Sequence, residues 1–413
     1  MDQDVEAGLK AQYEAYPYPA RNPMEETKRL FIGTPSHLRE IDYWVFGAQR
    51  LQNSPFRALI AGCGTGDGAI MLAQQLARSR QAEVICLDRS KAALEIARKR
   101  AEVRKLDNIS FHQAAIEDLP DLNLGSFDYI DCCGVLHHLA DPALGLSVLK
   151  NGLSPGGGMG LMVYAPYGRT GVYMVQDVLR RLTSIEEPPE KRLDVARRVM
   201  KNLPATAWLR FNGNFGDHLT GGDAGLYDLL LNPRDRAYTV DAFVLLLEQA
   251  GLAIKTFMEP ARYNPLLFLP DARLKERIGL LSWQEQAAMA EEVCGNMATH
   301  VVYVQKQGEE TPLLDPSSDE AIPIMREMPA EVLAKQIRPD GRMVAEFGTL
   351  QVLLPVPAYA QTVLGLIDGV RTVGEIKAIL AGRGISTVKF EKIWKETFTF
   401  FSSLNKVLLR APA

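Results

Sequence analysis

Residues 59–68, LIAGCGTGDG, limit the fold of this chain more than any other segment, because an apolar run there ends in closely spaced glycines. The pattern predicts a β-strand that turns directly into a helix over residues 69–77. Gly62, Gly64 and Gly66 can adopt positive φ and carry no Cβ, so a ligand can lie on the backbone, with an anionic part at the helix N-terminus. The loose dinucleotide pattern G-x-G-x-x-A and a purely structural turn are the alternatives.

A second apolar run, residues 83–87, ends at Asp88, 22 residues after Gly66. A doubly wound sheet places there the carboxylate that accepts hydrogen bonds from two ribose hydroxyls, and we predict this role for Asp88. The alternative is an N-cap for the next helix, although Ser90 can provide that cap. The sequence then predicts three further strands, within residues 108–113, 127–133 and 159–164.

The order of these segments and the residues in them resemble the class I S-adenosylmethionine-dependent methyltransferase family over residues 40–306. The resemblance implies a doubly wound, seven-stranded Rossmann-like sheet and S-adenosylmethionine as cofactor. In that family the glycine loop carries the methionine end, the acid after the second strand holds the ribose, and later segments border the adenine and face the methyl group. The cofactor-binding residues that it implies are Gly62, Gly64, Gly66, Asp88, Ile116, Asp118 and Gly134.

Two positions depart from the family pattern. Ile60 stands where many members have an acid, and Ala115 stands where many have the aspartate that meets the adenine amino group. We expect Glu117 or Asp118, together with the backbone of Ile116, to replace the adenine contact.

The catalytic candidates are His137 and His138, which follow the predicted fourth strand. Methyl transfer chiefly requires positioning, and a base is needed only when the acceptor has a proton to lose. Neutral imidazole is available near neutral pH, and we favour His138 as the base. The alternative is a histidine that packs against the helix predicted over residues 142–149.

The first 50 residues are predicted to cover the cofactor cleft, as an N-terminal segment does in many members of the family. Pro17 and Pro19 exclude one continuous helix there. Tyr16 and Tyr18 can face a sulfonium, whose positive charge suits aromatic faces; an aromatic clasp that only packs the N-terminus is the alternative.

The methyltransferase domain is predicted over residues 51–306, with an insertion at about 165–240 near the methyl-facing end of the sheet. Tyr164 and Tyr227 complete, with Tyr16 and Tyr18, the predicted substrate contacts. We interpret the insertion as a substrate lid, and a helical interface in a homodimer is the alternative. One charged helical stretch is expected over residues 178–202, and an antiparallel final strand over 299–306.

Residues 307–329 read as a linker, and residues 330–413 as a small winged-helix-like α+β domain. Residues 367–376 also resemble peptide-recognising modules of peptide-modification pathways. From Glu331 onward there are 11 Lys or Arg against 7 Asp or Glu, which permits a macromolecular partner. A chain ending near Gly308 is expected to retain the complete sheet and the cofactor.

The composition and net charge of the chain argue against several classes of function. The net charge of −4 argues against nucleic acid or an anionic membrane as partner, and no apolar run is long enough to span a membrane, so a cytoplasmic protein is expected. The five cysteines lack metal-ligand spacing, so no metal is expected. We expect a methyltransferase acting on a small-molecule or protein/peptide acceptor. A non-catalytic S-adenosylmethionine-binding regulatory module and, less favoured, a nicotinamide-dependent oxidoreductase are the alternatives.

Overall fold

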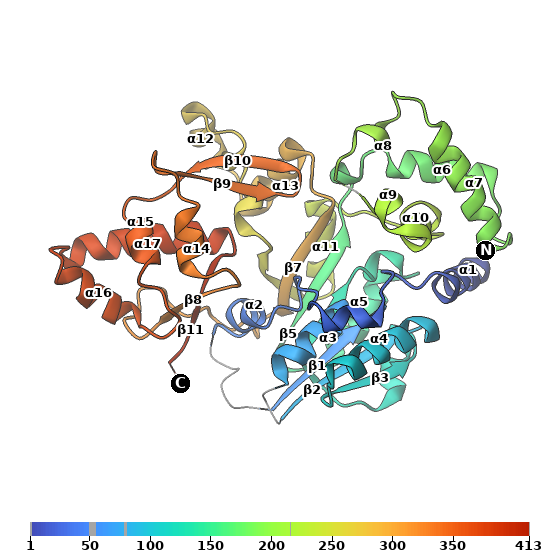
Figure 1. The fold of residues 1–413 in the computed structure, drawn as a ribbon, viewed down its shortest axis with the longest axis horizontal. Helices are drawn as coiled ribbons and strands as arrows, with labels where there is room; N and C mark the ends of the chain where they lie inside the picture. Colours follow the sequence, from blue (N-terminus) through green and yellow to red (C-terminus); the bar gives the residue numbers. More distant parts are fainter. Residues whose placement is uncertain (1, 49–54, 78–80, 215, 413) are drawn as a thin grey trace.

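A seven-stranded sheet forms the centre of the computed structural model, which describes residues 2–48, 55–77, 81–214 and 216–412 (Figure 1). The strand order is β3-β2-β1-β4-β5-β7-β6, and β7 runs antiparallel to both of its neighbours. This confirms the predicted sheet and the antiparallel final strand. The predicted boundary between residues 50 and 51 lies outside the described residues. The strands are β1 Phe56–Ala61, β2 Ala82–Asp88, β3 Ile109–Gln113, β4 Phe127–Cys133, β5 Leu153–Tyr164, β6 Leu252–Phe257 and β7 Thr299–Lys306.

Each face of the sheet has its own buried core, because side chains alternate along a strand. In β1, Ala58 and Ile60 face one core, and Leu59 and Ala61 face the other. The first core contains residues of α3 (Asp67–Leu76), α4 (Lys91–Arg104) and the π-helical turn η2 (Ile41–Val45). The second contains residues of α5 (Pro142–Asn151), α11 (Val240–Gln249) and α13 (Trp283–Cys294).

Two further segments lie around the sheet. The N-terminal part holds α1 (Asp2–Ala15), which ends before Pro17 as predicted, and then η1 (Pro23–Thr27) and α2 (Leu38–Glu40). The insertion after β5 consists of helices with a separate apolar core. The helical stretch predicted over 178–202 is wrong as one unit, because α6 ends at Leu182 and a second helix begins only at Pro189. The insertion helices are α6 Val172–Leu182, α7 Pro189–Asn202, α8 Trp208–Phe211, α9 Asp217–Thr220 and α10 Gly222–Leu231; α12 (Ala272–Ile278) follows β6.

The C-terminal region packs directly against the first sheet face. Its buried residues join the same core as those of η2, β1 and α3. Strand β11 does not pair with the hairpin of β9 and β10 but with β8, which lies inside the predicted linker. The winged-helix-like assignment therefore stays a prediction. The elements are β8 Ile322–Met325, α14 Ala330–Lys335, β9 Arg342–Phe347, β10 Leu350–Pro355, α15 Ala360–Leu364, α16 Val373–Ala381, α17 Thr387–Ser403 and β11 Val407–Arg410.

Candidate functional site

The glycine loop between β1 and α3 has the geometry that its sequence predicts. Gly62, Gly64 and Gly66 all have positive φ, and Gly66 is the N-cap of α3. A Cβ on Gly62 would lie 2.3 Å from Val135 Cγ2, and one on Gly66 would lie 2.9 Å from Ala97 Cβ. Side chains at these two positions would therefore collide with the segment after β4 and with α4. Glycine is required here by close approach as well as by backbone conformation.

Asp88, at the end of β2, holds this loop in place. Its Oδ2 accepts the Gly64 N–H at 2.7 Å, and its Oδ1 accepts the Ser90 N–H at 2.8 Å. The N-cap of α4 is Ser90, whose Oγ accepts the Ala93 N–H at 3.1 Å, so the N-cap alternative for Asp88 is wrong. Burial raises the pKa of Asp88. Its carboxylate lies beside the glycine loop, the position expected of a ribose-binding acid.

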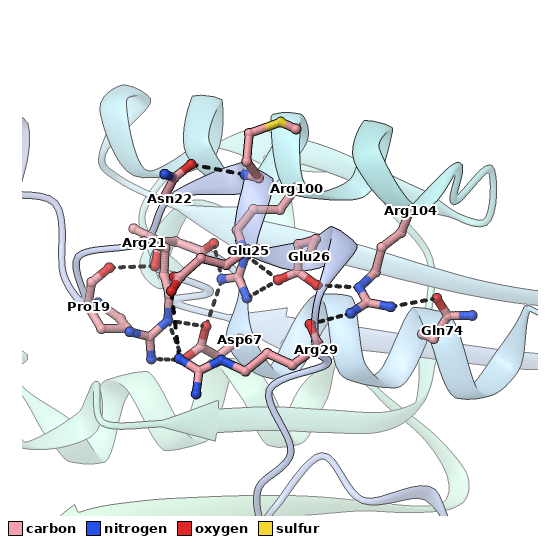
Figure 2. Close-up of polar contacts among 12 residues, drawn as sticks. Pro19, Arg21, Asn22, Glu25, Glu26, Arg29, Asp67, Gln74, Arg100 and Arg104 are labelled. Carbon is pink, nitrogen blue, oxygen red and sulfur yellow. Dashed lines mark hydrogen bonds and ion pairs between the residues drawn. The ribbon is translucent and has the colours of Figure 1, made fainter.

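Residues 12–27, named here the N-terminal strap, lie over the glycine loop. Thr65 Oγ1 donates to the Pro19 carbonyl at 2.7 Å, and a Cβ on Gly64 would lie 2.8 Å from the Tyr18 carbonyl oxygen. Arg21 forms a two-pronged ion pair with Asp67 at the start of α3, with Nη2 2.6 Å from Oδ2 (Figure 2). The strap therefore covers the loop that is expected to bind the cofactor.

A buried charge cluster fastens the strap to α3 and α4. Glu26 lies between the guanidinium groups of Arg100 and Arg104, and Arg100 also reaches Asp67 at 2.7 Å (Figure 2). The side chain of Arg100 is 1% exposed and that of Glu26 is fully buried. Removing one partner of such a buried ion pair strongly destabilises the folded protein.

The remaining cofactor candidates lie on two other segments. Ile116 is buried at the start of the turn η3 (Ile116–Leu122), and the Asp118 carboxylate accepts the Ala115 N–H at 2.9 Å. Asp118 is therefore used in a local cap. Gly134 has a φ of 78° and follows β4 directly. Their roles in cofactor binding stay predictions.

His137 and His138 lie together on the turn η4 (Leu136–His138), against Tyr164 at the end of β5. The ring centroids of His137 and Tyr164 are 3.8 Å apart, and those of the two histidines 4.2 Å apart. His137 is fully buried, and neither of its ring nitrogens has a hydrogen-bond partner within the described structure. Burial lowers its pKa well below the usual value, so His137 is neutral. His138 Nδ1 lies 2.6 Å from the Arg234 carbonyl oxygen and donates to it.

Asp228, on α10 of the insertion, belongs to the predicted lid but is not among the substrate contacts that the sequence predicts. Its carboxylate is buried beside Tyr164, whose hydroxyl lies 3.5 Å from Oδ2. The Oδ1 atom accepts hydrogen bonds from Tyr13 and Gln12, at 3.2 and 3.4 Å. The polar and aromatic composition of residues 227–238 was the only local signal for this contact.

Two of the other predicted substrate tyrosines, Tyr16 and Tyr227, pack in the insertion, whereas Tyr18 lies near enough to Tyr164 to contribute, after burial, to its raised pKa. Tyr16 stacks on Tyr227 with ring centroids 5.3 Å apart, and both contribute to the apolar core of the insertion. The Tyr227 hydroxyl accepts a hydrogen bond from Arg192 at 2.7 Å. Tyr164 is the one predicted substrate tyrosine with a ring contact to His137 and His138 among the described contacts.

No group of three or more His, Cys, Asp or Glu side chains among the described residues is placed to hold a metal ion. None of the helices described is long and apolar enough to cross a membrane.

Comparisons with known proteins agree with the geometry of the loop. Residues 53–176 match a family model described as a methyltransferase domain. An uncharacterized protein of Synechococcus sp. is 32% identical over 290 residues, which are 69% of this chain and 68% of that protein. The ubiquinone biosynthesis O-methyltransferase of Acinetobacter baylyi is 34% identical over 101 residues, but these span 24% of this chain and 40% of that enzyme.

Among solved structures, PKMT2 from Rickettsia typhi shares the fold, with a TM-score of 0.61 and 14% sequence identity over 91% of this chain and 75% of that chain. Its complex with AdoHcy superposes with a TM-score of 0.59. A glycine cradle that a Cβ would fill, beside a buried carboxylate, fits the same cofactor here. The chain belongs to the class I S-adenosylmethionine-dependent methyltransferases.

Proposed function

We propose that the protein methylates a small-molecule or protein/peptide acceptor that reaches His137, Tyr164 and Asp228 under the insertion. The observation that carries this proposal is the buried polar cluster at the ends of β4 and β5, where ligands lie in open α/β sheets. S-adenosylmethionine, when bound, supplies an activated methyl group.

The residues of the chain have separable tasks in this proposal. The glycine loop and Asp88 bind the cofactor, and the N-terminal strap and the insertion exclude water from it. His137 and His138 are the candidates to accept a proton from the acceptor, because both rings contact Tyr164 at the methyl-facing turn and His137 is neutral. Orienting the acceptor contributes more to the rate than proton transfer does.

The regulatory-module alternative predicts cofactor binding without turnover. The buried, unpartnered ring nitrogens of His137 favour an enzyme, since a site that only binds the cofactor has no need of them. The oxidoreductase alternative predicts binding of NADH, and the family assignment argues against it.

The test begins with calorimetric titration of the full-length protein with S-adenosylhomocysteine and NADH. Transfer of the labelled methyl group of S-adenosylmethionine is then measured on phenols, amines, thiols and peptides. We expect S-adenosylhomocysteine to bind and at least one acceptor class to be labelled. His138→Gln should reduce transfer without changing cofactor affinity. Cofactor binding without labelling of any class would support the regulatory module and contradict the proposal.

A further inference from the structure

The Asp228 carboxylate has no ion-pair partner among the described residues, although it is only 5% exposed. An isolated buried carboxylate is costly, and burial raises the pKa of Asp228 accordingly. Its hydrogen bonds from Tyr13, Gln12 and Tyr164 measure 3.2, 3.4 and 3.5 Å. Bonds to an ionised carboxylate are commonly about 2.5–2.9 Å long, so these three groups satisfy Asp228 weakly.

The cations near Asp228 are committed elsewhere. Arg169 pairs with Asp235 at 2.8 Å and lies over the Tyr164 ring. Arg234 pairs with Glu6. Asp228 therefore has no direct ion pair with a described arginine or lysine, although the nearby His138 and Arg169 partly oppose the effect of burial on its pKa.

One feature of this place suits a cationic guest. A positively charged nitrogen would form shorter, charge-assisted bonds with Asp228 than the present donors do. The hydroxyl groups of Tyr13 and Tyr164 face the carboxylate, and the Arg169 guanidinium already lies over the Tyr164 ring. Tyr164 also contacts His137, so a guest on Asp228 would lie next to the methyl-facing turn.

We propose that Asp228 binds the methyl acceptor and that this acceptor is an amine, which enters as its ammonium ion and displaces Tyr13 and Gln12 from the carboxylate. The proposal rests on the function proposed above and adds to it the acceptor atom, nitrogen, and a further catalytic residue. Asn232, which donates to the Tyr13 hydroxyl at 3.2 Å, would lose this partner when Tyr13 is displaced.

Methyl transfer to the amine requires the loss of one proton and the replacement of the C–S bond by a C–N bond. The ammonium group gives one proton to the Asp228 carboxylate, which here takes the role of base in place of His137 and His138. The neighbouring sulfonium charge favours this loss because like charges lower the pKa of an ammonium. The amine nitrogen forms a C–N bond with the methyl carbon while the C–S bond breaks, and the C–S electron pair stays on sulfur. The products are a methylated ammonium ion and S-adenosylhomocysteine, and Asp228 releases its proton to water.

The first arm of the test uses the full-length protein saturated with S-adenosylhomocysteine and two probes of equal length, n-pentylamine and 1-pentanol. Calorimetry should show the amine binding at least about tenfold more tightly than the alcohol, a difference of roughly 1.4 kcal/mol. Equal affinities, or binding of neither probe, would overturn the proposal.

The second arm compares Asp228→Asn with Asp223→Asn, which changes an exposed acid on the same helix that pairs with Arg197. Asp228→Asn should abolish the preference for the amine and keep the affinity for S-adenosylhomocysteine, and Asp223→Asn should change neither. Retention of the preference in Asp228→Asn would overturn the proposal. Weaker binding of S-adenosylmethionine alone would also overturn it, because Asp228 would then be the partner of the sulfonium.

Different experimental results would contradict the proposed function and the proposed amine acceptor. Transfer to phenols or thiols but not to amines would leave the methyltransferase function standing and overturn the amine acceptor. Cofactor binding without transfer to any class would contradict the proposed function, whatever the probes show.

Discussion

Glu26 of the N-terminal strap and Arg100 of α4 form a fully buried ion pair, with Oε1 2.6 Å from Nη2. The same guanidinium donates to the Thr65 carbonyl and to Asp67, both in the segment that leads into α3. One arginine thus connects the strap to the glycine loop beneath it. The strap is therefore held by charge that water does not screen.

Replacing Glu26 by Gln should remove the charge that compensates Arg100 and Arg104. Removing one partner of a buried pair costs about 3–5 kcal/mol, and we expect a loss of unfolding free energy near the lower end because Gln keeps a hydrogen-bonding oxygen. Urea unfolding measures the loss, and hydrogen exchange should increase in residues 12–27. Glu25→Gln, which changes a half-buried acid near Arg29 outside the Glu26–Arg100 pair, is the control and should change little. Unchanged exchange in the strap would contradict this account.

Replacing Gly64 by Val should weaken cofactor binding at least about tenfold. The new Cβ would lie 2.8 Å from the Tyr18 carbonyl oxygen, and φ there is +51°. Gly156→Val isolates the backbone effect, because its φ is +69° and a Cβ there would meet no atom within 4 Å. Calorimetry on both variants separates strain from contact. Equal affinity of both variants and the native protein would show that the loop is only a turn.

Replacing Asp88 by Asn should affect both stability and affinity. Asp88 accepts N–H groups from Gly64 and Ser90, so the amide would place its NH₂ group against one of these donors. We expect a lower melting temperature without cofactor and a loss of about 1.5–3 kcal/mol in binding of S-adenosylmethionine. Loss of stability with native affinity would assign Asp88 to the fold alone. Asp121→Asn, an exposed acid, serves as the control.

Asp131 on β4 predicts a pH dependence of stability. Burial raises its pKa to about 7, although it accepts a hydrogen bond from the Ser36 hydroxyl. The native state therefore holds a proton that the unfolded chain releases near pH 4, and stability should fall as the pH rises from about 4 to 7. Asp131→Asn should flatten this part of the profile and unfold at higher urea than the native protein at pH 8. An unchanged profile would contradict the raised pKa.

The sequence predicts the sheet well because the signals for it are local. The glycine loop, the acid at residue 88 and the strand at 299–306 are each contained in a few consecutive residues. The hydrogen bonds of Asp228 cannot be predicted in the same way, because its partners Gln12 and Tyr13 lie 216 and 215 residues away and no short pattern contains them. His137 and His138 follow the fourth strand as predicted, but only packing shows that they contact Tyr164 and which ring nitrogens are engaged.

The contacts of the C-terminal region are also too distant in the sequence to be predicted from local patterns. The proline-rich stretch after residue 307 predicts a separable module, but Glu40, fully buried on α2, pairs with Arg326 and accepts from Asn405 at 2.9 Å. Those partners are 286 and 365 residues away in the sequence. The composition of a linker therefore does not indicate whether the two regions that it joins pack against each other.

Ending the chain at Gly308 should therefore destabilise the methyltransferase sheet, contrary to the expectation from the sequence. The truncation removes both C-terminal partners of Glu40 and leaves the Tyr303 hydroxyl, 2.8 Å away, as its remaining donor from the sheet. It also uncovers Tyr43, whose ring lies 6.4 Å from that of Phe398, in a core that continues from β1 into α17. A buried charge without its cation and a large exposed apolar face both favour unfolding and association.

We expect the truncated chain to aggregate, or to melt at a lower temperature and bind S-adenosylhomocysteine more weakly than the full chain. Light scattering, thermal unfolding and calorimetry measure these outcomes. The full-length variant Arg326→Met provides the matched control, because it removes the cation from Glu40 and leaves the apolar contacts in place. If Arg326→Met loses less stability than the truncated chain does, the rest of the loss comes from the apolar core that the C-terminal region shares with the sheet. A monodisperse truncated chain with native cofactor affinity would show that the C-terminal region is separable after all.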